Sequence, residues 1–226
     1  VLRMRASRIQ LVGTLSALAD HLDPSLLEIM PLVVDMNSFS KEDIEGLDYE
    51  KRLGAYRQAN EPRYLALAPE QATVLLQQTL FELSSADMAM RHASSASLNA
   101  FLAAAAKALA AQEDPADKTG LPGLVRTLLL PQVKASLTNP DPVARSQYLE
   151  LMRGMVSTLP ALFPELLCLV DTDQEVDFFF NMTHLQVHRR VRALRKLHKA
   201  IGAKLLSRGI LSSLFIPLLQ SIIMEG

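Results

Sequence analysis

Apolar residues recur every three to four positions along most of the chain, which is the spacing of amphipathic α-helices. The pattern predicts a first helix over residues 1–21, with an apolar face formed by Ile9, Val12, Leu15 and Ala19. Asp23 and Pro24 predict the start of a second helix, because Asp caps free N–H groups and Pro suits a first turn. Pro31 predicts a kink inside that second helix.

The remaining apolar patterns extend this helical organisation to the end of the chain. They predict helices over about 69–83, 94–111, 124–137, 143–159, 162–170, 181–206 and 210–223. A polar stretch over 36–63, with a short helix at 49–53, suggests an insertion, and residues 112–122 suggest a loop. No run alternates with period two, and the abundant Leu and Ala favour helix over strand. We therefore predict an all-α protein.

Some local patterns return at regular distances. An Arg followed by apolar residues four and seven positions later occurs at Arg5, Arg145 and Arg190, the last two 45 residues apart. Pro131 and Pro217 lie in similar apolar settings, 86 residues apart. Repeats of about 40–47 residues made of helix pairs are typical of HEAT and armadillo proteins, whose pairs stack to cover their apolar faces. We predict that 1–226 is one α-solenoid segment of a much larger protein, although a closed helical bundle gives similar spacings.

The overall charge conceals an asymmetry. The chain of 226 residues holds 23 Lys and Arg against 24 Asp and Glu, which excludes a uniformly basic nucleic-acid binder. Residues 178–224, however, hold eight Lys and Arg and no acidic residue, leaving 15 basic against all 24 acidic residues elsewhere. The basic charge is thus concentrated in the predicted helix over 181–206.

Helical geometry separates this basic helix into two faces. One face is apolar and is predicted to pack; it holds Val187, Val191, Leu194, His198, Ile201 and Leu205. The other face carries the basic stripe, defined as Arg189, Arg192, Arg195, Lys196 and Lys199. Because no acidic residue stands at i,i+4 spacing, the basic stripe suits RNA phosphates or an acidic protein partner. The alternative is neutralisation inside the fold by the acidic segments at 171–177 or 42–50.

Other chemistry-bearing residues favour structural roles. His184 and His188 have a spacing that can hold a metal, with Asp177 as a conceivable third ligand, but adjacent arginines would repel a cation. Phe178–Phe180 are expected to fill a seam between repeats, and Cys168 to be buried and inert. Nucleotide-binding loops and catalytic constellations are missing from the sequence, so we predict no enzyme, no cofactor and no small-molecule substrate. The longest apolar stretch, 210–224, is too short for a membrane span.

The window 176–197 carries a more specific signal. It resembles a segment of the DRIM (down-regulated in metastasis) family, the U3 small nucleolar RNA-associated component twenty of the small-subunit processome, whose members are very large HEAT-repeat proteins. The matching residues are Asp177, Phe178, Phe179, Asn181, Met182, His184, Gln186, His188, Arg189, Arg190, Arg192, Ala193, Leu194 and Leu197. Phe180 departs from the pattern, which expects a polar residue there.

The resemblance implies a function that composition and periodicity do not. It implies a nucleolar, non-enzymatic scaffold of the small-subunit processome, or 90S pre-ribosome, that supports rRNA processing and 18S rRNA maturation in ribosome biogenesis. The implied partners are pre-ribosomal RNA and processome proteins of the U3 snoRNP, with no membrane. The alternative is a HEAT-repeat transport or signalling adaptor that binds protein partners.

Overall fold

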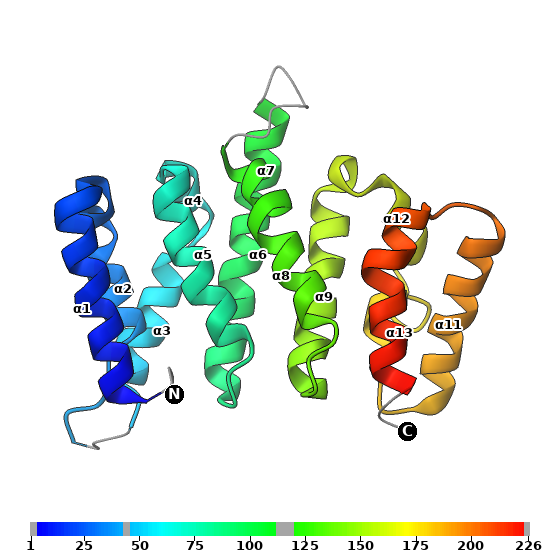
Figure 1. Cartoon of the computed structure of the whole chain (residues 1–226), viewed down its shortest axis with the longest axis horizontal. Helices are drawn as coiled ribbons and strands as arrows, with labels where there is room; N and C mark the ends of the chain where they lie inside the picture. The colour runs from blue at the N-terminus through cyan, green and yellow to red at the C-terminus, as the bar shows by residue number, and fades with distance from the viewer. Residues whose placement is uncertain (1–3, 43–45, 112–119, 224–226) are drawn as a thin grey trace. The chain divides into compact units, whose positions relative to one another are not determined.

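The computed structural model describes residues 4–42, 46–111 and 120–223, and they are helical nearly throughout (Figure 1). The first elements are α1 (Arg5–Leu22), η1 (Pro24–Glu28), α2 (Met30–Met36), α3 (Tyr49–Gln58), α4 (Glu61–Ala66), α5 (Pro69–Leu83) and α6 (Met88–Ala111). The next are α7 (Gly120–Leu124), η2 (Val125–Leu129), α8 (Leu130–Ser136), α9 (Pro142–Thr158), η3 (Pro160–Leu162) and η4 (Pro164–Leu169). The last are α10 (Phe178–Asn181), α11 (Val187–Gly202), α12 (Arg208–Ile210), η5 (Leu211–Phe215) and α13 (Ile216–Ile223).

Stacked helices confirm the predicted all-α, helical-repeat fold. These described ranges contain one isolated β-bridge, between Phe39 and Leu47, and no strand. The chain forms two compact units, 1–104 and 105–226, whose boundary falls inside α6. In unit 1, α2 packs against α1, α3 and α5; in unit 2, α8 contacts α9, α9 contacts α10 and α10 contacts α11. Most of these contacts join helices that follow one another along the chain, as expected for helix pairs that stack.

Proline positions explain several element boundaries. Asp23 caps η1, a 3₁₀ turn that begins at Pro24, and Asp141 caps α9, which begins at Pro142. Pro31 does not kink a helix as predicted: it lies in the first turn of α2, a new helix that starts at Met30. A proline is tolerated in that turn because the first N–H groups of a helix have no intrahelical partner.

The polar stretch over 36–63 is more ordered than its composition suggests. The predicted short helix at 49–53 is α3, which extends to Gln58, and α4 follows from Glu61. Asp48 caps α3, and the helix buries Arg52, Ala55 and Tyr56. This stretch therefore contributes to the core of unit 1. Of the loop expected at 112–122, residues 112–119 lie outside the described residues, and α7 begins at Gly120.

A buried ionic cluster lies in the core of unit 1. Glu82 on α5 forms ion pairs with Arg8 on α1 and Arg52 on α3, and all three side chains are at least 96% buried. Arg8 also donates to Asn37 and stacks over Phe81, 4.3 Å from the ring centroid. We name Arg8, Arg52 and Glu82 the Glu82 cluster; it joins three helices that are distant in sequence.

The repeat predicted from Pro131 and Pro217 has a structural counterpart in unit 2. Each proline follows a five-residue π-helical segment, η2 (Val125–Leu129) or η5 (Leu211–Phe215), and the two segments are displaced by the same 86 residues as the prolines. A proline ring lacks an N–H and clashes with the carbonyl four residues earlier, so the helix widens before it. The segments α7–η2–α8 and α12–η5–α13 therefore share the same order of elements, as the predicted repeat expects.

Candidate functional site

The basic helix α11 is held in place by the turn that precedes it. It spans Val187–Gly202, shorter than the predicted 181–206, because residues 178–181 form the separate helix α10. Asp177 is fully buried, and one carboxylate oxygen accepts hydrogen bonds from the N–H groups of Phe179 (2.9 Å) and Phe180 (3.2 Å). Its other oxygen accepts from Arg153 Nε (2.8 Å) and the N–H of Asp171 (3.0 Å). Asp177 therefore joins α9, α10 and the segment 171–175 between η4 and α10, which we name the acidic loop.

Asn181 continues this connection into α11. Its side-chain nitrogen donates to the carbonyls of Gln174 (2.7 Å) and Asp177, and its oxygen accepts from Arg189 Nε (2.7 Å). A second guanidinium nitrogen of Arg189 lies 2.9 Å from His184 Nε2. Asp177, Asn181, His184 and Arg189 all belong to the window that carries the family resemblance. In this fold these four residues set the position of the basic helix.

The acidic loop contacts one side of the basic stripe. Arg192 pairs with Glu175 at 2.7 Å and Lys196 with Asp171 at 3.1 Å. The Lys196 hydrogen bond lowers the pKa of Asp171 below its ordinary value, and the Arg192 hydrogen bond does the same to the pKa of Glu175. With Arg189 bonded to Asn181, three of the five residues of the basic stripe have partners inside the fold.

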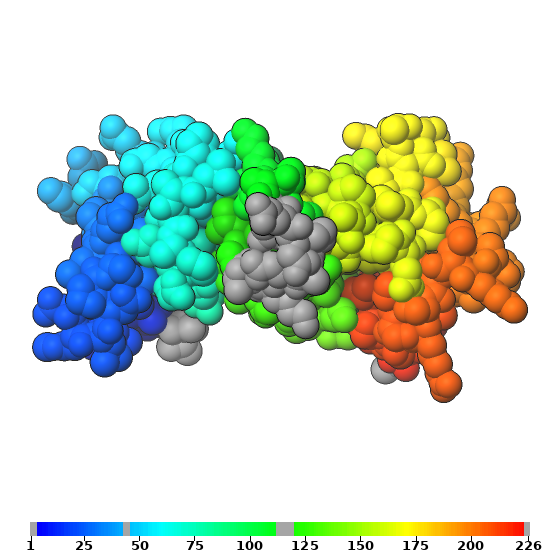
Figure 2. Space-filling view, turned by 90° about the horizontal axis from the view of Figure 1, so that it is seen from above, coloured from blue at the N-terminus to red at the C-terminus, as the bar shows by residue number. Residues whose placement is uncertain are grey.

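Arg195 and Lys199 form the remaining part of the basic stripe. Both are exposed and lie one helical turn apart on α11. Among the described residues, neither forms a hydrogen bond or an ion pair, and no acidic residue follows Asp177 up to Ile223. The basic stripe therefore presents two adjacent, solvated cations that an external anion can reach (Figure 2 shows the orange segment, which includes α11, at the surface).

The pKa of Asp171 reports whether this loop carboxylate pairs with Lys196 of the basic stripe. Because its folded-state pKa lies below the ordinary value of about 3.9, its ionic pairing is complete above that value and is lost as the pH falls through the folded pKa. We expect Lys196→Gln to raise the Asp171 pKa toward the ordinary value in a carboxyl NMR titration. The control Lys199→Gln, three residues further along, should leave it unchanged. An unaltered Asp171 pKa in Lys196→Gln would show that the pair does not form.

The apolar face of α11 is not where the pattern predicted it. Val187, Leu194 and Leu205 are 62%, 40% and 51% exposed, and His198, expected in the core, is exposed as well. The side that packs is instead Ala193, Leu197 and Ala200. The prediction was wrong because periodicity locates an apolar stripe without showing what covers it. The two buried alanines contribute little to a hydrophobic pattern.

The candidate metal ligands and the three phenylalanines at 178–180 make contacts that fit structural roles. The described residues contain no group of three His, Cys, Asp or Glu side chains placed to hold a metal ion. Desolvation, followed by the charge of Arg189, lowers the pKa of His184, and its Nδ1 accepts from the N–H of Gln186. Phe178 is buried and meets Phe179 and Phe215 edge to face, as the seam prediction requires, whereas Phe180 is half-buried against Arg153. 

Cys168 differs from its prediction. Its side chain is half-buried, not buried, and its thiol donates to the carbonyl of Glu165. Desolvation raises the pKa of the thiol, which disfavours the reactive thiolate.

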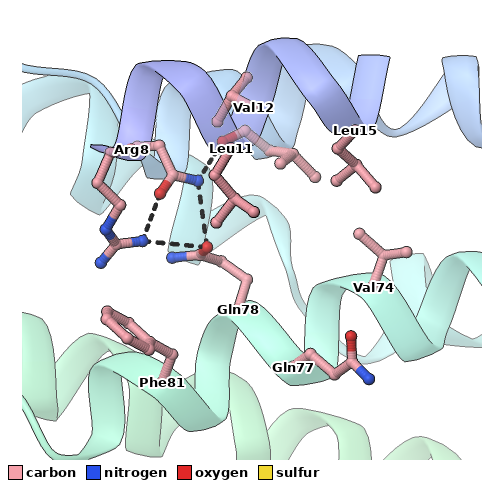
Figure 3. Close-up of a pocket in the computed structure, with 10 residues that line it drawn as sticks. Arg8, Leu11, Val12, Leu15, Val74, Gln77, Gln78 and Phe81 are labelled. Atoms are coloured by element: carbon pink, nitrogen blue, oxygen red, sulfur yellow. Dashed lines mark hydrogen bonds between the residues drawn. The ribbon is translucent and has the colours of Figure 1, made fainter. Parts of the chain in front are cut away.

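A cavity of about 230 Å³ lies in unit 1 between α1 and α5 (Figure 3). Its walls are largely apolar, with Leu11, Val12 and Leu15 facing Val74. Arg8, the one ionisable residue among those that line it, is bonded to Asn37 and Gln78. The cavity thus offers an apolar depression without the paired ionisable groups of acid–base chemistry. In the described part of the chain, no helix combines the length and apolarity needed to cross a membrane.

The stacked helices define a helical-repeat protein, and the basic helix lies at its surface. The family model described as "U3 small nucleolar RNA-associated protein 20, N-terminal" matches residues 1–141, and the chain belongs to this family. The resemblance noted at 176–197 lies outside that range and is therefore independent of it.

Two curated relatives extend the similarity over most of the chain. The U3 small nucleolar RNA-associated protein 20 of Schizosaccharomyces pombe is 24% identical over 204 residues, or 88% of this chain. That of Saccharomyces cerevisiae is 26% identical over 201 residues, or 87% of this chain. The chain spans only 8% of the length of either relative.

Proposed function

We propose that residues 1–226 are one α-solenoid segment of a much longer, non-enzymatic scaffold that acts in ribosome biogenesis. Its place is the nucleolus, in the small-subunit processome, where the scaffold supports pre-rRNA processing and 18S rRNA maturation. Family membership and the name of the two relatives, which refers to U3 small nucleolar RNA, support this proposal. Their much greater length supports a scaffold of which this chain is one part.

Within this function, the basic stripe contacts the RNA backbone through Arg195 and Lys199. The observation that carries this assignment is that these two cations are exposed and unpaired in the described structure, on a helix fixed by Asp177 and Asn181. Phosphates bind such cations with release of counterions, so the affinity depends on salt. Arg192 and Lys196 are less available because the acidic loop already holds them.

The test is the double charge reversal Arg195→Glu and Lys199→Glu in an RNA-binding titration at several salt concentrations. For two lost phosphate contacts on single-stranded RNA, the slope of log affinity against log salt should fall by about 1.4. The matched control reverses one exposed lysine and one exposed arginine of unit 1, Lys41→Glu and Arg57→Glu. If both variants lose the same RNA affinity, the loss comes from the change in net charge and not from the basic stripe. Unchanged RNA binding together with loss of an acidic protein would assign the basic stripe to that protein.

A further inference from the structure

Arg192 adds a third position to the two open cations of the basic stripe. It precedes Arg195 by three residues and Lys199 by seven, a spacing that places all three on one face of α11. Arg195 and Lys199 are open, whereas Arg192 donates to Glu175 of the acidic loop at 2.7 Å. In Figure 2 the yellow and orange segments, which include the acidic loop and α11, lie beside each other at the surface. The protein thus presents a row of three cations and occupies the first of them itself.

The ion pair between Arg192 and Glu175 is open to solvent. The side chain of Arg192 is 47% exposed and that of Glu175 is 63% exposed. Exposed ion pairs contribute little to stability, because water solvates both charges when they separate. Rotation of the Glu175 side chain frees Arg192, while the backbone N–H of Glu175 stays bonded to Asp173 and the buried anchor Asp177 stays in place. An external anion can therefore replace this carboxylate at small cost.

The other ion pair of the acidic loop is held more firmly. The side chain of Lys196 is only 18% exposed. Its ammonium group donates to the carbonyl of Val170 (3.3 Å) as well as to the carboxylate of Asp171 (3.1 Å). Lys196 therefore stays bonded to the loop backbone even when Asp171 turns away. This pair ties the loop to α11, whereas the pair of Arg192 and Glu175 is the one that can be exchanged.

We propose that Glu175 is an internal competitor of RNA, whose carboxylate occupies the place on Arg192 that a backbone phosphate takes in the complex. This inference rests on the proposed function, because it needs RNA on Arg195 and Lys199. A carboxylate and a phosphate both accept charge-assisted hydrogen bonds from a guanidinium group. An RNA strand that binds the two open cations also brings its neighbouring phosphates to α11 at a high effective concentration. The free protein therefore presents two cations, and the complex uses three.

The exchange of carboxylate for phosphate has a distinct salt dependence. When a phosphate binds an open cation, the RNA releases counterions, and log affinity falls with log salt by about 0.7 per phosphate on a single strand. When a phosphate displaces Glu175, the freed carboxylate takes up a cation, so the release and the uptake largely cancel. Glu175→Gln removes the competitor and makes Arg192 a third open cation. The variant should therefore bind RNA more tightly and with a steeper salt dependence.

The experiment measures the binding of an oligouridylate to the chain of 226 residues over a series of salt concentrations. We expect Glu175→Gln to raise the affinity severalfold, and by about fivefold at most, because an exposed ion pair is weak. The slope of log affinity against log salt should steepen by about 0.7, the value for one phosphate contact. The matched control Asp173→Asn removes the same charge from an exposed residue of the same loop that pairs with no described cation. It should leave the slope unchanged.

Arg192→Gln shows whether the gain passes through Arg192. Combined with Glu175→Gln, it should return the slope to that of the unsubstituted chain. A gain that survives this combination, or an equal gain in Asp173→Asn, overturns the inference, because the gain then comes from net charge.

The double charge reversal of Arg195 and Lys199 tests the proposed function separately in the same assay. If that reversal lowers the slope while Glu175→Gln leaves it unchanged, the basic stripe binds RNA and Glu175 does not compete for it. If neither change alters the slope, both proposals fail. A steeper slope in Glu175→Gln, lost again with Arg192→Gln, supports the inference.

Discussion

Glu82→Gln is expected to lower the free energy of unfolding by about 3–5 kcal/mol, the usual cost of removing one partner of a buried ion pair. The substitution leaves the guanidinium groups of Arg8 and Arg52 buried without their common carboxylate. Burial already lowers the pKa of Arg52, and the charge of Glu82 opposes that shift. The remaining contacts are stacking on Phe81 and Phe39 and hydrogen bonds to the neutral groups of Asn37, Gln78 and the Ser38 carbonyl, and they do not replace a negative charge.

Chemical denaturation of the 226-residue chain measures this loss. The control Glu70→Gln removes an exposed carboxylate from the first turn of the same helix, α5, and should cost less than about 1 kcal/mol. Equal, small effects of the two substitutions would mean that the Glu82 cluster does not hold α1 and α3 against α5.

Asp177→Ala is expected to have a comparable effect, about 3–5 kcal/mol, in unit 2. The substitution removes the N-cap of α10 and leaves Arg153 without its buried partner. It also frees the N–H of Asp171, so the acidic loop and α11 lose their common anchor. We therefore expect the Asp171 pKa to rise toward its ordinary value in the same variant.

The matched substitution for this test is Asp173→Ala in the same loop. Asp173 is exposed, and its carboxylate accepts one backbone hydrogen bond, from Glu175. Its removal should cost less than about 1 kcal/mol, since an exposed local hydrogen bond contributes little to stability. If denaturation midpoints of Asp177→Ala and Asp173→Ala agree, Asp177 is not the anchor of this turn.

Local rules account for much of the fold. Asp23 and Asp141 mark helix starts because capping depends on the residue and its immediate successors. Pro131 and Pro217 reveal the repeat for the same reason, since a proline acts on the turn that precedes it. Pro31 shows the limit of such rules: a proline in a helical pattern is compatible with a kink or with a new start, and packing decides between them.

Features that depend on distant segments could not be predicted in this way. The Glu82 cluster joins α1, α3 and α5, and single charged residues give no signal of such pairing. The packed side of α11 depends on small alanines, whereas its apolar stripe is open. The basic stripe was predicted as a surface, but its division into loop-bound and open residues depends on the positions of Asp171 and Glu175.

The central claim is that this chain is part of a pre-ribosomal scaffold. Its most direct test is affinity purification of the full-length protein, followed by sequencing of the bound RNA and identification of the bound proteins. The account predicts enrichment of the 18S rRNA precursor and U3 small nucleolar RNA together with small-subunit processome proteins. Recovery of transport cargo or signalling subunits, without pre-ribosomal RNA, would contradict it.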